Sequence, residues 1–258
     1  MADPFRLDGR TALVTGANTG LGRAIAIALA EAGADIAAVA RRDSKETGEA
    51  VAKSGRKFLE LRADLSSTSP IKDIVGRTRE RFGRLDILIN NAGIIRRADA
   101  IEFSEEDWDA VVDTNLKSAF FLAQEAARGM MEDGNGGKIV NIASMLSYQG
   151  GIRVASYTAS KSGLAGITRL LANEWAGKGI NVNAIAPGLT RTPGTTQQKI
   201  PGGMSAEALF DHMAQTQSIK RSEVATDLVG AVSFLASDDA AFITGQTLYV
   251  NGGLTRST

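Results

Sequence analysis

The stretch ALVTGANTGLG, residues 12–22, joins a short apolar run to a helix-forming run of small residues. Glycines at the join permit positive φ angles and let the backbone approach a ligand closely. Amide N–H groups at the start of the following helix would then stabilise a pyrophosphate. The spacing differs from GxGxxG, and a tight strand-to-helix turn without a ligand is the alternative. The stretch predicts a strand, a glycine-rich turn and a helix.

The same alternation continues along the chain. Short runs that favour strands alternate with longer runs of helical apolar spacing. The expected strands are residues 12–15, 36–40, 58–61, 85–90, 138–143, 180–186 and 247–250, and the expected helices are 20–32, 69–82, 105–131, 156–177 and 223–235. Nearly continuous apolar strands are typical of a parallel sheet that helices cover on both faces. The pattern predicts an α/β fold: a Rossmann-type, doubly wound, seven-stranded parallel sheet in three α/β/α layers, with a single domain over residues 1–258.

One segment, residues 190–220, departs from this pattern. Two prolines and three glycines break its first part, and residues 205–215 favour a short helix. We expect this insertion to be a substrate lid at about residues 190–220.

Composition excludes several function classes. Lys plus Arg and Asp plus Glu both number 29, so a net charge of zero argues against nucleic acid as a partner. The absence of cysteine excludes disulfides and thiolate chemistry and is consistent with a cytoplasmic location. No export signal or apolar run of about 18 residues is present, so no membrane association is expected. His212 is the only histidine, and we expect no metal site.

The end of the second expected strand bears on which nucleotide binds. An acid there can bind the adenosine ribose, whereas arginine can accept a 2′-phosphate. Arg41 and Arg42 follow Ala40, so NADP(H) is favoured, with NAD(H) as the alternative if Asp43 serves as the ribose ligand. Further along the chain, Asp64 could accept a hydrogen bond from the adenine amine.

A tyrosine and a lysine four residues apart suggest acid/base chemistry. Tyr157 and Lys161 would lie one helical turn apart on one face. A phenol has a pKa of about 10, and a nearby cation that stabilises phenolate makes it usable near neutral pH. Ser144, at the end of the fifth strand, could hydrogen-bond a substrate oxygen. Asn115, an unfavourable residue inside a helix, could bend that helix and hold a water in a proton relay.

Together these residues resemble the short-chain dehydrogenases/reductases in the TGxxxGxG, NNAG, helix Asn, strand-end Ser, YxxxK and PG elements. The resemblance spans nearly the whole chain and implies an oxidoreductase with Asn115, Ser144, Tyr157 and Lys161 as catalytic residues. The expected cofactor-binding residues are Gly16, Asn18, Gly20, Leu21, Gly22, Arg41, Arg42, Asp64, Leu65, Asn91, Ala92, Gly93, Tyr157, Lys161, Pro187, Gly188 and Thr192. The resemblance implies that Pro187, Gly188 and Thr192 contact the nicotinamide end. It also implies a homotetramer built through the helices that begin near Glu105 and Ser156. Candidate outward apolar residues are Phe120, Phe121, Leu164, Ile167 and Leu171, and core packing is the equally good alternative for them.

Within the family, residues 90–99, 103–108 and 136–162 look like the enzymes that act on deoxy sugar acids, although those usually prefer NAD. Such a substrate needs a cation for its carboxylate, and Arg97 and Arg153, with Gln149 as a polar partner, are the candidates, beside Arg96. Solvated or intersubunit arginines are the alternative. Other functions left open are oxidoreduction of a neutral ketone or polyol and a non-catalytic nucleotide sensor. A sugar-nucleotide epimerase is disfavoured, because such enzymes typically need a sizeable C-terminal substrate domain.

Overall fold

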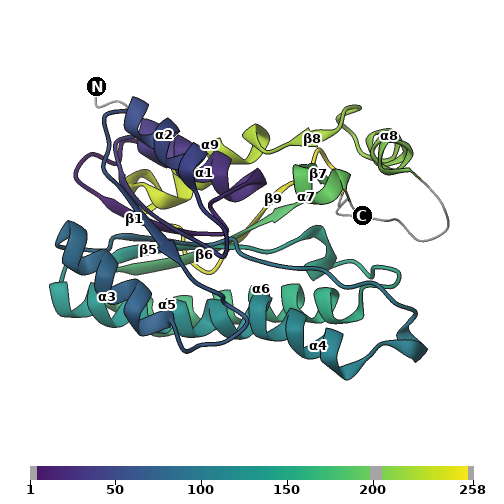
Figure 1. The fold of residues 1–258 in the computed structure, drawn as a ribbon, viewed down its shortest axis with the longest axis horizontal. Coiled ribbons are helices and arrows are strands. Elements are labelled where there is room, and N and C mark those ends of the chain that lie inside the picture. Colours follow the sequence, from purple (N-terminus) through teal and green to yellow (C-terminus); the bar gives the residue numbers. More distant parts are fainter. Residues whose placement is uncertain (1–4, 198–204, 255–258) are drawn as a thin grey trace.

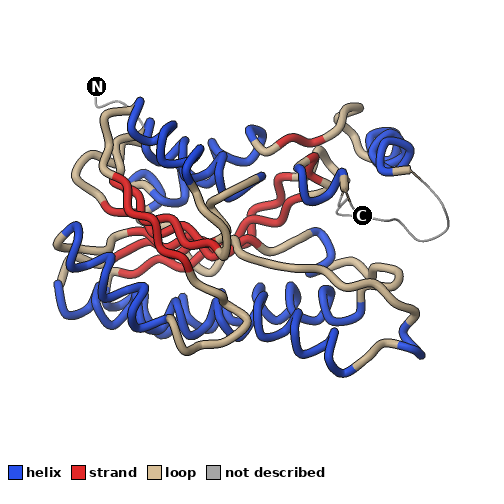
Figure 2. Tube along the Cα trace, viewed as in Figure 1, coloured by secondary structure: helices blue, strands red, loops and turns tan. Residues whose placement is uncertain are grey.

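The computed structural model describes residues 5–197 and 205–254, and its centre is a seven-stranded parallel sheet with the strand order β3-β2-β1-β4-β5-β6-β9 (Figures 1 and 2). The strands are β1 Thr11–Thr15, β2 Asp35–Ala40, β3 Phe58–Arg62, β4 Ile87–Asn90, β5 Gly137–Ile142, β6 Ile180–Pro187 and β9 Thr247–Val250. The order reverses between β1 and β4, where a doubly wound sheet opens a crevice at the carboxyl ends of its strands. The predicted fold class is confirmed.

Helices cover both faces of the sheet (Figure 1). One layer holds α1 Gly20–Glu31, α2 Lys45–Lys53 and α9 Thr226–Ala236, and the other holds α3 Ile71–Phe82, α4 Glu105–Val112, α5 Ser118–Asp133 and α6 Ala155–Trp175. Two buried aliphatic clusters, one on each face, fill the space between helices and sheet. Because both faces are covered, β1 and β4 are buried along their whole length, which explains their apolar sequences.

The boundaries differ from the sequence predictions at several points. Residues 105–131, expected as one helix, form α4 and α5 around a π-helical turn, Asp113–Lys117. Residues 45–53 form α2, which was not predicted. Glu223 and Val224, expected to begin the last helix, form the short strand β8 instead, paired in parallel with β7, Thr190–Arg191. The remaining short helices are the 3₁₀ turns Ala100–Glu102, Met145–Ser147, Ala176–Lys178 and Asp238–Ala240.

The expected lid region contains α7, Pro193–Thr196, and α8, Ala206–Thr216, beside the two-stranded β7-β8 sheet (Figure 1). Arg191 of β7 holds α8, because its guanidinium pairs with Glu207 at 2.6 Å and lies 4.3 Å from the ring centroid of Phe210. The part of the lid prediction on residues 198–204, including Pro201, Gly202 and Gly203, lies outside the described residues.

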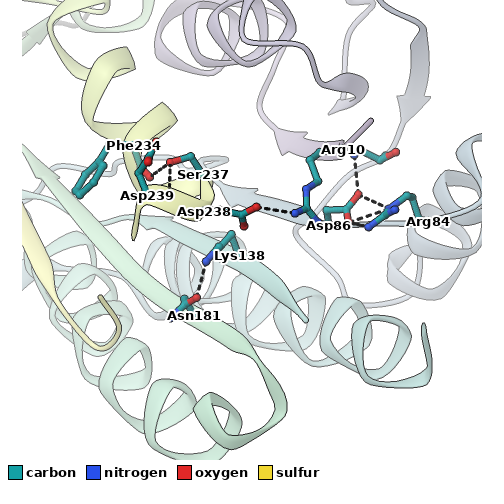
Figure 3. Close-up of polar contacts among 10 residues, drawn as sticks. Arg10, Arg84, Asp86, Lys138, Asn181, Phe234, Ser237, Asp238 and Asp239 are labelled. Atoms are coloured by element: carbon teal, nitrogen blue, oxygen red, sulfur yellow. Dashed lines mark hydrogen bonds and ion pairs between the residues drawn. The ribbon is translucent and has the colours of Figure 1, made fainter. Parts of the chain in front are cut away.

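A charged network lies at the amino ends of the strands, opposite the crevice (Figure 3). The buried carboxylate of Asp86 accepts the Thr11 N–H at 2.8 Å and pairs with Arg84 and Arg10. Arg10 also pairs with Asp238 at 2.8 Å. These contacts tie β1, β4 and the chain after α9 together on the side away from the crevice.

The five apolar residues proposed to face outward differ in their exposure. Leu164 and Leu171 are buried inside the protein, so that part of the prediction is wrong: core packing explains them. Phe120 and Ile167 are partly buried. Phe121 is exposed, as are Trp108 on α4 and Leu170 on α6. The exposed apolar surface of these helices is therefore made by a different set of side chains.

Candidate active site

A cleft of about 460 Å³ opens at the β1/β4 switch point. Thirteen of the residues expected to bind a cofactor line it: Gly16, Asn18, Gly20, Leu21, Gly22, Arg41, Arg42, Asp64, Leu65, Asn91, Ala92, Gly93 and Thr192. Val39, Ala40, Ala63, Ile94, Thr114, Thr19 and Gly194 complete the lining. Tyr157, Lys161, Pro187 and Gly188 are not part of this lining. The size of the cleft is within the range usual for small-molecule and cofactor sites.

The glycine-rich turn between β1 and α1 requires its glycines. Gly16 and Gly20 have φ angles of 66° and 54°. A Cβ on Gly22 would lie 2.2 Å from the carbonyl oxygen of Gly16 and 2.5 Å from Nδ2 of Asn91. The turn is thus a cradle that a single added carbon would fill, which fits the close backbone approach that a dinucleotide pyrophosphate needs.

Polar side chains hold this turn against the neighbouring strands. The buried Thr15 hydroxyl accepts the N–H groups of Asn91 and Ala92, both at 2.9 Å, and donates to the Ile89 carbonyl. Asn91 Nδ2 donates back to the Thr15 carbonyl at 2.8 Å. The ends of β1 and β4 are therefore locked together beneath the cleft.

Two further supports were missed by the sequence analysis. The buried hydroxyl of Thr47, on α2, donates to the Ala17 carbonyl at 2.8 Å. The guanidinium of Arg23 donates to the Asn18 carbonyl at 2.6 Å and 3.1 Å. Arg23 follows the motif directly and carried a local signal, whereas Thr47 is 30 residues from its partner and carried none.

The carboxyl ends of β2 and β3 lie at the end of the cleft where the adenosine is expected to bind. Arg41 and Arg42 are exposed and line the cleft wall. Asp64 is also exposed, and one of its carboxylate oxygens accepts the Ser66 N–H at 2.9 Å, so the residue also shapes the turn after β3. Leu65 is buried beside it.

Tyr157, Lys161 and Ser144 converge where α6 begins beside the end of β5. Burial raises the pKa of the Tyr157 phenol, while a hydrogen bond with Ser144 and the charge of Arg97 oppose that rise. Lys161 is 4% exposed, and burial lowers its pKa to about 8. Its Nζ donates to the Ile142 carbonyl at 2.6 Å and lies 5.7 Å from the centroid of the Tyr157 ring. The site thus holds a phenol near the amine of Lys161, and the charge of Arg97 acts on the same phenol.

Asn115 lies in the π-helical turn between α4 and α5. Its Oδ1 accepts the Ile94 N–H at 2.8 Å, and its Nδ2 donates to the Ile94 carbonyl at 2.9 Å and to Ser160 at 3.3 Å. A Cβ on Gly93 would lie 3.2 Å from Oδ1 of Asn115 and 3.7 Å from Nζ of Lys161. The expected local bend at Asn115 is present, and its side chain ties the bend to the chain after β4.

The expected nicotinamide-side residues follow β6. Pro187 ends that strand, and Gly188 is partly buried beyond it. Thr192 lines the cleft and packs against the glycine-rich turn, since a Cβ on Gly20 would lie 3.3 Å from the Thr192 Cβ.

The arginines expected to bind substrate occupy different environments. Arg153 pairs with Asp99 at 3.1 Å and has a φ of 63°, which is unusual for a residue other than glycine. Arg96 is exposed and pairs with Asp107 at 3.0 Å. Arg97 is half-buried, burial lowers its pKa, and its charge acts on Tyr157. Gln149 is partly buried in the turn after Ser147.

Within residues 5–197 and 205–254, no group of three or more His, Cys, Asp or Glu side chains is placed to hold a metal ion. In the same ranges no helix combines the length and apolar character needed to cross a membrane.

Comparisons with known proteins agree with this geometry. The family model described as enoyl-(acyl carrier protein) reductase matches residues 16–255. A crystal structure of a short-chain type dehydrogenase/reductase from Mycobacterium marinum is 31% identical, with 98% of each chain covered and a TM-score of 0.90. The chain therefore belongs to the short-chain dehydrogenase/reductase family and is an NAD(P)-dependent oxidoreductase that acts on CH–OH groups.

Two relatives indicate which members of the family this chain resembles. The 2-dehydro-3-deoxy-D-gluconate 5-dehydrogenase of Escherichia coli is 51% identical over 249 residues, which are 96% of each protein. A structure from Agrobacterium tumefaciens, described as a proposed 2-deoxy-D-gluconate 3-dehydrogenase with bound NADP, is 48% identical. It has a TM-score of 0.86, with 98% of each chain covered. The resemblance to sugar-acid enzymes within the family is thus confirmed at the level of relatives.

Proposed function

We propose that this protein interconverts a hydroxyl and a carbonyl group on a sugar acid of the deoxy-gluconate or keto-deoxy-uronate type, with NADP(H) as the favoured cofactor. The observation that carries the substrate class is the half-buried guanidinium of Arg97, whose charge acts on the Tyr157 phenol. A cation in that position binds a substrate carboxylate while the reacting carbon lies near the phenol. The names of the relatives from Escherichia coli and Agrobacterium tumefaciens support the same class.

The proposed chemistry uses four side chains. A bound nicotinamide would supply hydride exchange with the substrate carbon. In the oxidative direction the Tyr157 phenolate takes the hydroxyl proton, and Ser144 donates a hydrogen bond to the same oxygen. The Lys161 cation stabilises phenolate, and Asn115 supports the water-mediated exchange of that proton with solvent. Reduction runs these steps backward.

Tyr157→Phe tests the proton-transfer role. We expect turnover to fall by about a hundredfold or more, with cofactor affinity largely unchanged, because only the proton-transferring hydroxyl is lost. Turnover equal to that of the wild type would contradict the assignment of Tyr157.

The carboxylate assignment is tested by kinetics on 2-dehydro-3-deoxy-D-gluconate and a neutral ketose of similar size. Arg97→Ala should raise KM for the acid about tenfold to a hundredfold and leave that for the ketose unchanged, because a charge-assisted hydrogen bond is lost. Arg96→Ala is the matched control, since the neighbouring Arg96 is exposed and paired with Asp107. Equal KM values for wild type and Arg97→Ala would remove the proposed carboxylate contact.

The cofactor preference rests on Arg41 and Arg42, which line the cleft at the end of β2. They can pair with a 2′-phosphate, and the NADP bound in the Agrobacterium relative supports the same choice. NAD(H) is the alternative. Arg41→Ala and Arg42→Ala should together lower the ratio of kcat/KM for NADPH over NADH by about tenfold or more, whereas Lys45→Ala should leave it unchanged. An unchanged ratio in the double variant would remove the proposed 2′-phosphate contact, and a wild-type ratio below one would favour NAD(H).

Two alternatives are decided by the same assays. Turnover confined to neutral ketones or polyols would replace the sugar-acid assignment. Cofactor binding without turnover on any substrate would favour a nucleotide sensor.

We also propose that residues around 190–220 act as a substrate lid and that residues 1–258 form one catalytic domain.

We further propose that the protein works as a cytoplasmic homotetramer. The exposed Trp108, Phe121 and Leu170 on α4, α5 and α6 support an interface on these helices. Sedimentation of the purified protein tests the oligomeric state: a monomer at micromolar concentration would contradict it.

A further inference from the structure

The segment between β6 and α7, residues 187–192, has a fixed place beside the cofactor cleft. It leaves the carboxyl end of β6 and continues through β7. At its far end Thr192 packs on Gly20 of the glycine-rich turn. Its conformation therefore sets the shape of the cleft on the side where the nicotinamide end is proposed to bind.

One carboxylate from a distant part of the chain holds this segment. Glu223 is only 6% exposed. Its Oε2 accepts the Gly188 N–H at 3.1 Å, and its Oε1 accepts the Thr190 hydroxyl. The backbone of Glu223 also pairs with Thr190 in the β7-β8 sheet. Both the main chain and the side chain of Glu223 thus bond to the segment.

The surroundings of Glu223 show why these two donors matter. The nearby cation Arg221 is already paired with Asp227 at 2.6 Å. A buried carboxylate is costly unless hydrogen bonds compensate its lost hydration. Burial does raise the pKa of Glu223, and the bonds from Thr190 and Gly188 oppose that rise. The carboxylate and the segment are therefore mutually dependent.

Gly188 is fitted tightly against the same group. A Cβ on Gly188 would lie 3.2 Å from Oε2 of Glu223 and 3.2 Å from the Cβ of Asn251. The glycine backbone is thus wedged between the carboxylate and the chain that follows β9. Little room remains for the segment to shift while Glu223 is in place.

We propose that Glu223 is a positioning residue that holds residues 187–192 in the conformation that receives the nicotinamide end of the cofactor. It acts through Gly188 and Thr190 and contacts no reacting atom. The inference rests on the proposed placement of the nicotinamide beside this segment.

Calorimetric measurement of cofactor binding in the absence of substrate tests this proposal. The ligands are the dinucleotide that the wild type binds more tightly and its fragment without nicotinamide: 2′,5′-ADP for NADP⁺, or ADP for NAD⁺. Glu223→Ala should weaken dinucleotide binding about tenfold and leave fragment binding unchanged. The reason is that loss of the carboxylate should disorder residues 187–192, which lie on the nicotinamide side, and leave the rest of the cleft intact. Glu223→Gln should stay within about threefold of the wild type, since its amide can accept from Gly188 and donate to Thr190.

Asp227→Asn is the matched control, because Asp227 lies four residues away and pairs with Arg221 rather than with the segment. Thr190→Val, which removes one donor without changing shape, should weaken dinucleotide binding in the same direction, and Thr190→Ser should restore it. Thr190→Val also keeps the test decisive if Glu223→Ala does not fold.

Wild-type dinucleotide affinity in a folded Glu223→Ala or Thr190→Val protein would overturn the proposal. So would an equal loss of affinity for the fragment, which indicates general loosening of the cleft. Because no sugar acid is present, these results are independent of the proposed substrate. Failure of the proposed function would show instead as missing turnover by a protein that binds its cofactor normally.

Discussion

Lys161 should lower the stability of the cofactor-free protein at neutral pH, and Lys161→Met should reveal this. Burial lowers its pKa from 10.5 to about 8. Each pH unit between these values is worth about 1.4 kcal/mol, so protonated Lys161 lowers the free energy of unfolding by about 3 kcal/mol at pH 7. Since the folded-state pKa is the lower one, the penalty is fully present below about pH 8 and is relieved as pH rises toward 10.5.

The assay is urea denaturation of wild type and Lys161→Met at pH 7 and pH 9.5. Raising the pH should stabilise the wild type by about 2 kcal/mol relative to the variant. The hydrogen bond from Lys161 to the Ile142 carbonyl is also lost, but that cost is the same at both pH values to a first approximation and cancels from the comparison. Lys72→Met, at an exposed position on α3, should show no such difference. Equal pH dependence of wild type and Lys161→Met would refute the electrostatic reasoning.

Three further outcomes are expected. Gly22→Ala should abolish measurable dinucleotide binding in calorimetry, because its Cβ would lie 2.2 Å from the Gly16 carbonyl oxygen, and normal binding by this variant would be contrary evidence. The control Gly76→Ala, whose Cβ would meet nothing within 4 Å, should stabilise α3 by up to about 1 kcal/mol in denaturation. Asp86→Asn should cost about 2 kcal/mol in urea denaturation, because it leaves the contact with Arg84 (Figure 3) and the acceptance of the Thr11 N–H incomplete. An unchanged midpoint would count against this. Thr47→Val should weaken dinucleotide binding a few-fold by freeing the Ala17 carbonyl, an idea that wild-type affinity would reject.

Where the sequence predictions succeeded, the signal was local. The strand, glycine turn and helix around residues 12–22 appear as predicted, because backbone sterics at Gly16 and Gly22 act within a few residues. The apolar strands were recognisable because burial on both faces leaves little room for polar residues. Where predictions failed, tertiary contacts had overridden the local pattern. Leu164 and Leu171 have the spacing of one apolar helix face, which can pack on the core or on another subunit, and both are buried.

The sequence by itself determined the fold class, the family and thirteen of the cleft-lining residues, since these depend on periodicity and on residue types at fixed spacing. Only the tertiary structure decided which arginine acts on Tyr157 through its charge, that Thr47 supports the glycine-rich turn, and that Glu223 belongs to a strand that bonds to residues 187–192. These contacts join positions about 30 to 60 residues apart. No local propensity specifies such pairs, because they arise only when the sheet brings the ends of its strands together.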